Sequence, residues 1–244
     1  MNKTKKTVED YFYGSPVRIA EKILFIKREN RLGEYREYLT DVVEFGNVWK
    51  GITGVLRGER VSIIVTGIGP GLVGDAVYAL NKPNAVCLYS GTCGGLKNGL
   101  KIGDYFLAEE AICADGISFL FGHENLSSVH SDKRAFSSVK ATLNQLKVPF
   151  SEGLSFTTSS VVRENDANFW EFVSPQCLVI EMGCAAFYTA ALHSHKRAVA
   201  YFWVSDLPTL GKSFFDPLSA DEIAIKQARY EVAVKMDLSI LSFL

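Results

Sequence analysis

Two short apolar runs, each ending in a glycine-rich turn, constrain the fold of this chain more than any other feature. Residues 61–66, VSIIVT, lead into GIGPG, and residues 85–89, AVCLY, lead into SGTCGG. Between them, residues 71–80 carry apolar side chains at helical spacing, and an asparagine and a proline end that helix. The order strand, helix, strand predicts a βαβ unit, and therefore a parallel sheet with a right-handed crossover.

The glycine-rich ends of these two strands predict a ligand site. Backbone N–H groups in such turns can meet an anion or a sugar hydroxyl, and ligands of open α/β sheets bind beyond the carboxyl ends of the strands. Thr92 and Gly94 lie in the second turn. We therefore expect the site to form around this turn.

Composition favours one domain, residues 1–244, that binds a small molecule. The 244 residues are 48% hydrophobic, which is enough for a large core, and no linker interrupts them. The 26 basic and 27 acidic residues nearly cancel, which argues against nucleic acid or an anionic membrane as the main partner. No apolar run approaches the roughly 20 residues of a spanning helix, so a soluble, cytoplasmic protein is expected.

The cysteines and histidines indicate neither a metal site nor a nucleophile. His123 and His130 lie in a polar segment without metal-ligand partners at useful spacing. Cys93 lies inside the proposed site turn, where a small packing residue is favoured over a nucleophile. An odd number of cysteines without paired spacing predicts buried, reduced thiols at Cys87, Cys93, Cys113, Cys177 and Cys184.

Two acidic residues follow buried apolar strands. Glu181 ends the run CLVIE, and Asp206 follows AVAYFWVS. A carboxylate is costly to bury without a partner, so these positions suggest hydroxyl recognition or proton chemistry. A helix cap at Glu181 and an Asx turn at Asp206 are the structural alternatives. Two such acids at two strand ends favour a site.

The region before the first glycine-rich turn contains a second candidate anion site. Residues 14–18, GSPVR, combine a glycine–proline turn with an arginine at a helix start, which suits anion binding. An ordinary capped helix with a surface arginine is equally compatible. The apolar spacing of residues 19–26 predicts a helix that runs toward a strand, and residues 29–47 are expected to be helical around Tyr35 and Tyr38.

Four short motifs together indicate a family. TGIG, GTCGGLKNGLKIGDYFL, IEMGCAA and VSDLP occur in the order and spacing of the nucleoside phosphorylase and nucleosidase superfamily, and they cover most of the chain. The chain resembles this superfamily, and its CGGLK, GDYFL and ENDANFWEF segments are most similar to the short AMP nucleosidases. The resemblance implies an α/β fold, a three-layer sandwich around a mixed, partly closed central sheet. It also implies homo-oligomers, from dimers to hexamers, and no cofactor or metal.

The resemblance further implies roles for individual residues. These are Gly14 and Arg18 at phosphate, Thr92 and Gly94 at the sugar or phosphate, Phe156 and Val161 at the base, Glu181 and Met182 at the ribose, and Ser205 and Asp206 beside the base. Cleavage of a ribosyl bond passes through a cationic sugar, which a carboxylate stabilises, and an acid allows the base to leave neutral. Asp206 would protonate purine N7 and would need a raised pKa, which burial favours.

The chain also departs from the family pattern. Tyr89 and Asn47 stand where phosphorylases carry arginines, and each lost charge-assisted bond removes about 1.5 to 3 kcal/mol from phosphate binding. Water is therefore the preferred nucleophile. Gly183 replaces an acid that grips ribose hydroxyls, and Ser159 and Ser160 replace arginines that could hold a 5′-phosphate.

Three functions remain open at this stage. The first is hydrolytic cleavage of the N-glycosidic bond of a purine nucleoside or nucleotide. The second is phosphorolysis of a purine nucleoside or uridine, with inorganic phosphate held by Arg18 and a compensating cation such as Lys50. The third, from another class, is a nucleoside-binding protein that has lost catalysis.

Overall fold

A computed structural model describes residues 7–14 and 19–244 of the chain. The helices are α1 Val8–Tyr13, η2 Glu29–Arg31, α2 Leu32–Arg36, α3 Pro70–Tyr78, α4 Gly116–Leu120, α5 Lys133–Gln145, η3 Val162–Asn165, η4 Ala167–Glu171, α6 Cys184–His193, η5 Pro208–Leu210 and α7 Ala220–Phe243. The strands are β1 Lys22–Ile26, β2 Thr40–Gly46, β3 Lys50–Leu56, β4 Glu59–Val65, β5 Val86–Gly95, β6 Tyr105–Ala114, β7 Ser128–His130, β8 Phe150–Thr158, β9 Val179–Glu181 and β10 Arg197–Asp206.

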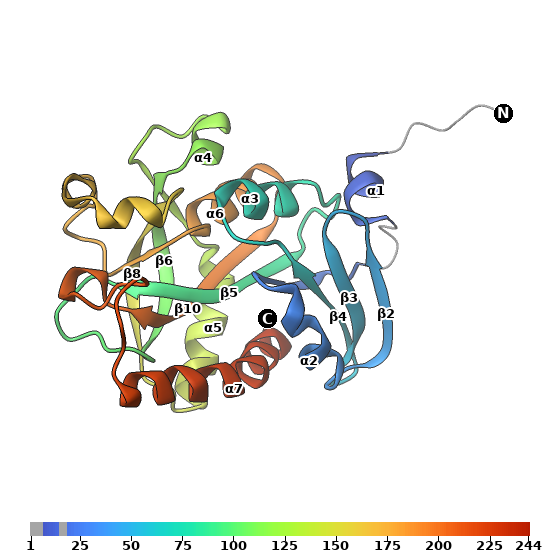
Figure 1. The fold of residues 1–244 in the computed structure, drawn as a ribbon. Helices are drawn as coiled ribbons and strands as arrows, with labels where there is room; N and C mark the ends of the chain where they lie inside the picture. Colours follow the sequence, from blue (N-terminus) through green and yellow to red (C-terminus); the bar gives the residue numbers. More distant parts are fainter. Residues whose placement is uncertain (1–6, 15–18) are drawn as a thin grey trace.

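All ten of these strands belong to one mixed sheet that is partly closed. Its order is β10-β6-β8-β9-β5-β1-β4-β3-β2, with β7 paired to β6 (Figure 1). Because β10 also pairs with β5, the strands β5, β10, β6, β8 and β9 form a ring, and β1, β4, β3 and β2 extend from it. The predicted mixed, partly closed sheet is confirmed.

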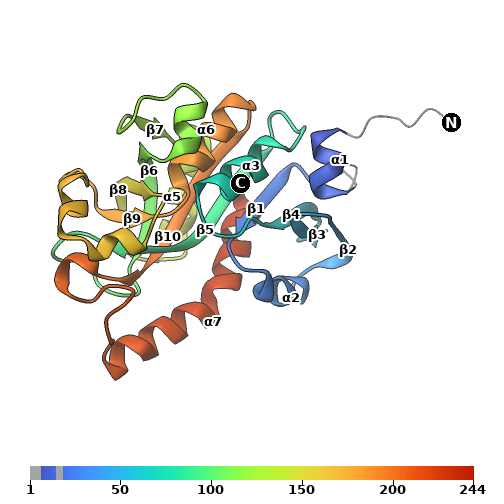
Figure 2. The ribbon, with the colours of Figure 1, turned by 45° about the horizontal axis from the view of Figure 1, so that its top comes forward.

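Helices cover both faces of the sheet and complete three layers. In Figures 1 and 2, α3, α4 and α6 lie on one side of the strands, and α2, α5 and α7 lie on the other. The small side chains of α6 explain its close packing, since Cys184 to Ala191 are all buried. Gly74 of α3 packs closely against α4, because a Cβ there would lie 2.8 Å from Ile117 Cγ2. Among the described residues, none of the helices is long and apolar enough to cross a bilayer.

The predicted βαβ unit is present, with one strand inserted between its two strands. β4 and β5 both pair in parallel with β1, so they run in the same direction on either side of it. A hairpin joins β3 to β4 at Arg57 and Gly58, whose φ angles of 51° and 88° match a two-residue turn with both residues left-handed.

Of two helix predictions near the start, the first is wrong and the second is confirmed only in part. The apolar run in residues 19–26 forms the strand β1 from Lys22, because β4 and β5 flank it and Ile23 to Ile26 are all buried. In residues 29–47 the helical part ends at Arg36. The rest forms β2, an edge strand whose one close neighbour is β3.

One buried carboxylate joins α7 to the rest of the molecule. Asp237 is 2% exposed and accepts hydrogen bonds from the hydroxyls of Tyr35, Ser90 and Tyr201, which come from α2, β5 and β10. The Ser90 bond measures 2.6 Å. A buried carboxylate is tolerated because its oxygens have these partners. Asp237 therefore fixes the C-terminal helix to the strand that carries the glycine-rich turn.

We expect Asp237→Ala to lower the free energy of unfolding by at least about 2 kcal/mol, because it leaves the hydroxyls of Tyr35, Ser90 and Tyr201 without their acceptor. Urea denaturation followed by fluorescence measures this change. Asp75→Ala, at an exposed position of α3, is the matched control and should change the stability by less than about 0.5 kcal/mol. Equal effects of the two substitutions would show that the Asp237 cluster does not hold α7.

Candidate active site

Gly94 of β5 is the point where the two predicted acids approach each other. It pairs with Ile180 of β9 on one side and with Asp206 of β10 on the other. Glu181 follows Ile180 directly, so both acids lie at the same strand end. A Cβ on Gly94 would lie 3.0 Å from Ile180 Cγ2 and 3.1 Å from Pro208 Cδ, so a side chain at this position would crowd both neighbours.

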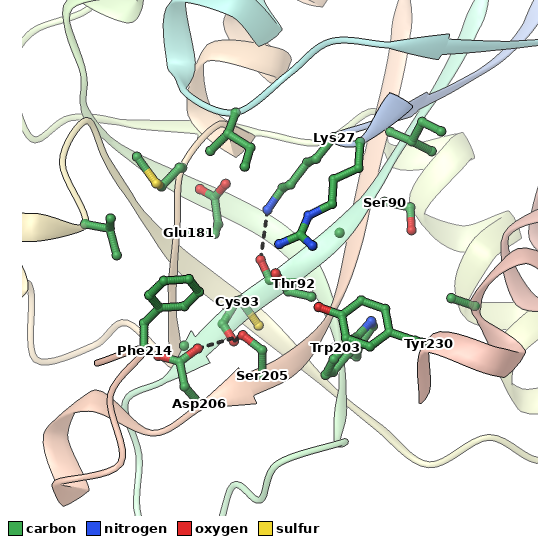
Figure 3. Close-up of a pocket in the computed structure, with 18 of the residues that line it drawn as sticks. Lys27, Ser90, Thr92, Cys93, Glu181, Trp203, Ser205, Asp206, Phe214 and Tyr230 are labelled. Carbon is green, nitrogen blue, oxygen red and sulfur yellow. Dashed lines mark hydrogen bonds between the residues drawn. The ribbon is translucent and has the colours of Figure 1, made fainter. Parts of the chain in front are cut away.

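A cavity of about 220 Å³ opens at this strand end (Figure 3). It brings together seven of the residues predicted from the sequence: Thr92, Gly94, Val161, Glu181, Met182, Ser205 and Asp206. They come from β5, β9, β10 and the turn after β8. A concave site with a few convergent polar groups is the usual form of a small-molecule site.

Glu181 is both a cavity residue and a helix cap. It is 4% exposed, accepts a hydrogen bond from the Thr157 hydroxyl, and accepts from the N–H groups of Gly183 and Cys184 at 2.6 and 2.7 Å. Burial raises the pKa of Glu181 to about 6, although the Thr157 bond and the charge of Lys27 oppose the rise. These bonds fix the carboxyl group in one orientation.

Asp206 lies at the other side of Gly94. It is 7% exposed, and the Ser205 hydroxyl donates to its Oδ1 at 2.6 Å. Burial raises the pKa of Asp206, while the Ser205 bond and the charges of Lys226 and Lys27 oppose the rise. An Asx turn would need an N–H two residues on, where Pro208 has none. The cavity therefore holds a carboxyl group that is shifted toward protonation.

A third acid, Glu164, lines the same cavity and was not predicted as a site residue. It lies in η3, the turn that follows β8. Burial raises the pKa of Glu164 to about 7, with a further contribution from the charge of Asp206. The sequence signal was present, since Glu164 is an acid shortly after a buried strand, as are the other two.

Three cations that follow β1 also line the cavity and were missed. They are Lys27, Arg28 and Arg31. The Lys27 ammonium donates to the Thr92 carbonyl oxygen at 3.0 Å, as Figure 3 shows. Lys27 immediately follows a parallel strand, a position that would have identified it. The incorrect helix prediction for residues 19–26 concealed this signal.

Three predicted residues lie elsewhere or outside the described chain. Phe156 is buried in a small cluster with Phe169, at 6.4 Å between ring centroids, instead of lining the cavity. Gly14 caps α1 with φ 80° and approaches Gly46. Arg18 falls outside the described residues.

Lys50, the other cation considered for phosphate, and Asn47, the position of a lost arginine, do not line the cavity. Lys50 forms a surface ion pair with Glu29 at 2.5 Å. Asn47 is exposed, and its amide donates to the Tyr11 carbonyl oxygen at 3.0 Å. Lys50 is therefore not the compensating cation within this chain, whereas Lys27 lies at the site.

Two departures from the family pattern, Tyr89 and Gly183, lie next to each other in the core. Tyr89 is fully buried between the rings of Phe187 and Phe202. A Cβ on Gly183 would lie 2.9 Å from the Tyr89 hydroxyl oxygen and 3.0 Å from Val73 Cγ2. That hydroxyl has no hydrogen-bond partner among the described residues. The tyrosine therefore occupies the space that a side chain at residue 183 would need.

The predicted buried thiols are present, and burial lowers their reactivity. All five cysteines are free and buried. Burial raises the pKa of Cys93 well above its usual range, so this thiol stays protonated and is a poor nucleophile. Within the described part of the chain, no three His, Cys, Asp or Glu residues are grouped so that they could hold a metal ion.

The chain is similar to several known proteins. The family model of the phosphorylase superfamily matches residues 23–231. A DeoD-type purine nucleoside phosphorylase of Brevibacillus brevis is 27% identical over 176 residues, covering 70% of this chain and 72% of that protein. The corresponding protein of Mycoplasma pneumoniae is 27% identical over 206 residues, covering 79% of each.

Two solved structures share the fold. Uridine phosphorylase from Vibrio fischeri ES114 superposes with a TM-score of 0.78 at 15% identity, covering 93% of both chains. The 5′-methylthioadenosine/S-adenosylhomocysteine nucleosidase from Neisseria meningitidis, solved with methylthio-immucillin-A, gives 0.69 at 19% identity, covering 90% of this chain and 95% of that one. The chain belongs to the phosphorylase superfamily. This confirms the resemblance predicted from the four motifs, and with it the enzyme class of nucleoside phosphorylases and nucleosidases.

We expect Gly183→Ala to lower the free energy of unfolding by about 1 to 3 kcal/mol, because the new methyl group meets Tyr89 and Val73. Tyr89→Phe removes a hydroxyl that lacks a partner among the described residues, so it should leave the stability unchanged or raise it. In the double variant, part of the cost of Gly183→Ala should disappear. Strict additivity in chemical denaturation would contradict the steric coupling of these two residues.

The pKa of Glu164 predicts a specific pH dependence of stability. Between its ordinary value of 4.5 and about 7, the folded protein holds a proton that the unfolded chain releases, so stability falls as the pH rises through this range. Glu164→Gln should remove this contribution. The melting temperature of the variant should therefore decrease less between pH 5 and pH 8 than that of the wild type. The exposed Glu171→Gln serves as control, and parallel curves for all three proteins would refute the shifted pKa.

Proposed function

We propose that this protein cleaves the N-glycosidic bond of a purine nucleoside or nucleotide and releases the free base, with water as the nucleophile. One observation carries the proposal: Glu181 and Asp206 flank Gly94 at one strand end and line the same cavity. Membership of the phosphorylase superfamily supports it. The DeoD-type relatives act on purine nucleosides by name, which supports the choice of base.

The two acids have different tasks in this mechanism. Asp206, with a pKa raised by burial, donates a proton to purine N7 so that the base leaves as a neutral molecule. Glu181 is held by Thr157 and two backbone N–H groups, so it keeps its orientation while positive charge develops on the ribose. The pKa of about 6 for Glu181 leaves it largely ionised at neutral pH, as this role requires.

Water is the preferred nucleophile because the arginines of the phosphorylase pattern are absent at residues 47 and 89. Asn47 binds the backbone near α1, and Tyr89 is buried in the core. A homo-oligomer of two to six chains, a cytoplasmic location and the likeness to short AMP nucleosidases are parts of the same proposal. They follow from the sequence resemblance.

Phosphorolysis is the second candidate, and Lys27 favours it. This ammonium group lies in the cavity wall beside Thr92 and replaces one of the absent arginine charges. The two reactions differ in one measurable way. Base release by hydrolysis is independent of inorganic phosphate, whereas phosphorolysis requires it and yields a sugar 1-phosphate.

We expect Asp206→Asn to reduce kcat for base release by about 10² to 10⁴, because an amide cannot donate the proton to N7. Nucleoside binding, measured by calorimetry, should persist, because the amide has the same shape. Asp221→Asn, at an exposed position of α7, is the matched control and should keep its activity. Undiminished base release by Asp206→Asn would exclude Asp206 as the acid. Absence of base release from the wild type would favour the nucleoside-binding alternative.

A further inference from the structure

Glu164 is an acid of the cavity that has no task in the proposed mechanism and no partner in the described protein. It is half-buried and lines the cavity. Among the described residues, its carboxyl group forms neither an ion pair nor a hydrogen bond. Glu181 and Asp206, by contrast, accept hydrogen bonds from groups of the protein. The oxygens of Glu164 therefore remain free to accept from a ligand.

The base of a bound nucleoside belongs on the Asp206 side of the cavity. The proposed mechanism places purine N7 at Asp206 and the ribose at Glu181. Figure 3 shows the ring of Phe214 on the Asp206 side, away from Glu181, and this side chain lines the cavity although it is 63% exposed. An aromatic ring in a cavity wall offers a surface on which a base can stack. Phe214 and Asp206 thus mark the position of the base.

Glu164 reaches the same part of the cavity from another element. It follows β8 in the turn that also carries Val161, a second residue of the cavity wall. The charge of Asp206 acts on its carboxyl group, so the two acids lie within electrostatic range of each other. In a purine, the substituent at C6 is the neighbour of N7 on the same edge of the base. A group near Asp206 that contacts this edge therefore meets the C6 substituent.

The two common substituents at C6 differ in hydrogen bonding. An amino group donates, as in adenine, whereas an oxo group accepts, as in guanine and hypoxanthine. An ionised carboxylate only accepts, so it pairs with the amino group and leaves the oxo group facing a second acceptor. A polar group that loses its partner on binding costs free energy, and a site of this kind therefore rejects the analogue strongly.

We propose that Glu164 contacts the C6 substituent of the bound purine and selects an amino group over an oxo group. This inference rests on the proposed function for the position of the base, and it deepens that function by naming 6-aminopurine compounds as the substrate class. Phe214 contributes affinity without selection, because stacking depends little on the identity of the base. Glu164 is thus a specificity-determining residue, and Asp206 remains the acid.

The selection depends on pH, because Glu164 titrates near neutrality. Burial raises the pKa of Glu164 to about 7, and the charge of Asp206 adds to the rise. Arg163, next to Glu164, pairs with Asp166 at 3.1 Å, and Lys226 of α7 acts on Asp206. The other charged groups of the cavity wall are Lys27, Arg28, Arg31, Glu181 and Asp237. Below about pH 7 the protonated carboxyl group can donate to an oxo group, so the preference for an amino group should rise with pH.

Calorimetric titration with the free bases adenine and hypoxanthine tests the assignment without turnover, because neither compound has a glycosidic bond. Both bases carry N7, so the ratio of their dissociation constants reports the contact at C6. We expect the wild type to bind adenine at least about tenfold more tightly than hypoxanthine at pH 8, and we expect this ratio to fall at pH 6.

Three variants separate selection from general affinity. Glu164→Gln supplies an amide that both donates and accepts, so the ratio should fall below about threefold and no longer change with pH. Phe214→Ala should weaken the binding of both bases at least about fivefold and leave their ratio unchanged, because the stacking surface is lost for each. Glu171→Gln, at an exposed position of η4, is the matched control and should keep the wild-type ratio.

Each outcome decides one point. Equal binding of the two bases by the wild type at pH 8, or binding of neither, overturns the assignment. A Glu164→Gln variant that keeps the wild-type ratio at both pH values overturns it as well. Misfolding would abolish the binding of both bases, so it cannot produce a changed ratio. If the wild type selects adenine but releases no base from any nucleoside or nucleotide, the proposed function fails and the assignment of Glu164 stands.

Discussion

The double pairing of Gly94 is the constraint from which the site follows. Because β5 runs beside β9 on one edge and beside β10 on the other, this glycine lies between Ile180 and Asp206. The two catalytic candidates are therefore positioned by strand register rather than by flexible loops, which gives a site on rigid elements. Asp237 of α7 holds the same strand through its hydrogen bond from Ser90. The geometry of the cavity is thus a direct property of the closed sheet.

Burial shifts the pKa values of the acids and of the lysine in this cavity in opposite directions. It raises the pKa of Glu181 to about 6 and that of Glu164 to about 7, and it also raises the pKa of Asp206. It lowers the pKa of Lys27, whereas the charge of Glu181 raises it. An anion beside Lys27 would stabilise its charged form, because opposite charges in a poorly solvated site favour each other. The protonation of these acids and the charge of Lys27 therefore depend on each other within a single cavity.

The sequence predicted those parts of the site that depend on local pattern. An apolar run that ends on an acid or on glycines is visible without a structure, which is why Asp206 and Thr92 could be found. Lys27 could not, because the strand nature of the preceding residues depends on β4 and β5, which are distant in sequence. Phe156 was misplaced because only the fold decides which face of β8 meets the cavity. The steric conflict between Tyr89 and a side chain at residue 183 could not be predicted either, because it depends on how the two residues pack in the fold.

The central claim is that Glu181 and Asp206 act on one nucleoside in one cavity. Incubation of the purified protein with purine nucleosides and their 5′-monophosphates, followed by chromatography of the products, tests it most directly. The account predicts that free purine base accumulates from at least one of these compounds, with or without added phosphate. If no base is released from any of them under either condition, the two acids do not form a glycosidic-bond-cleaving site.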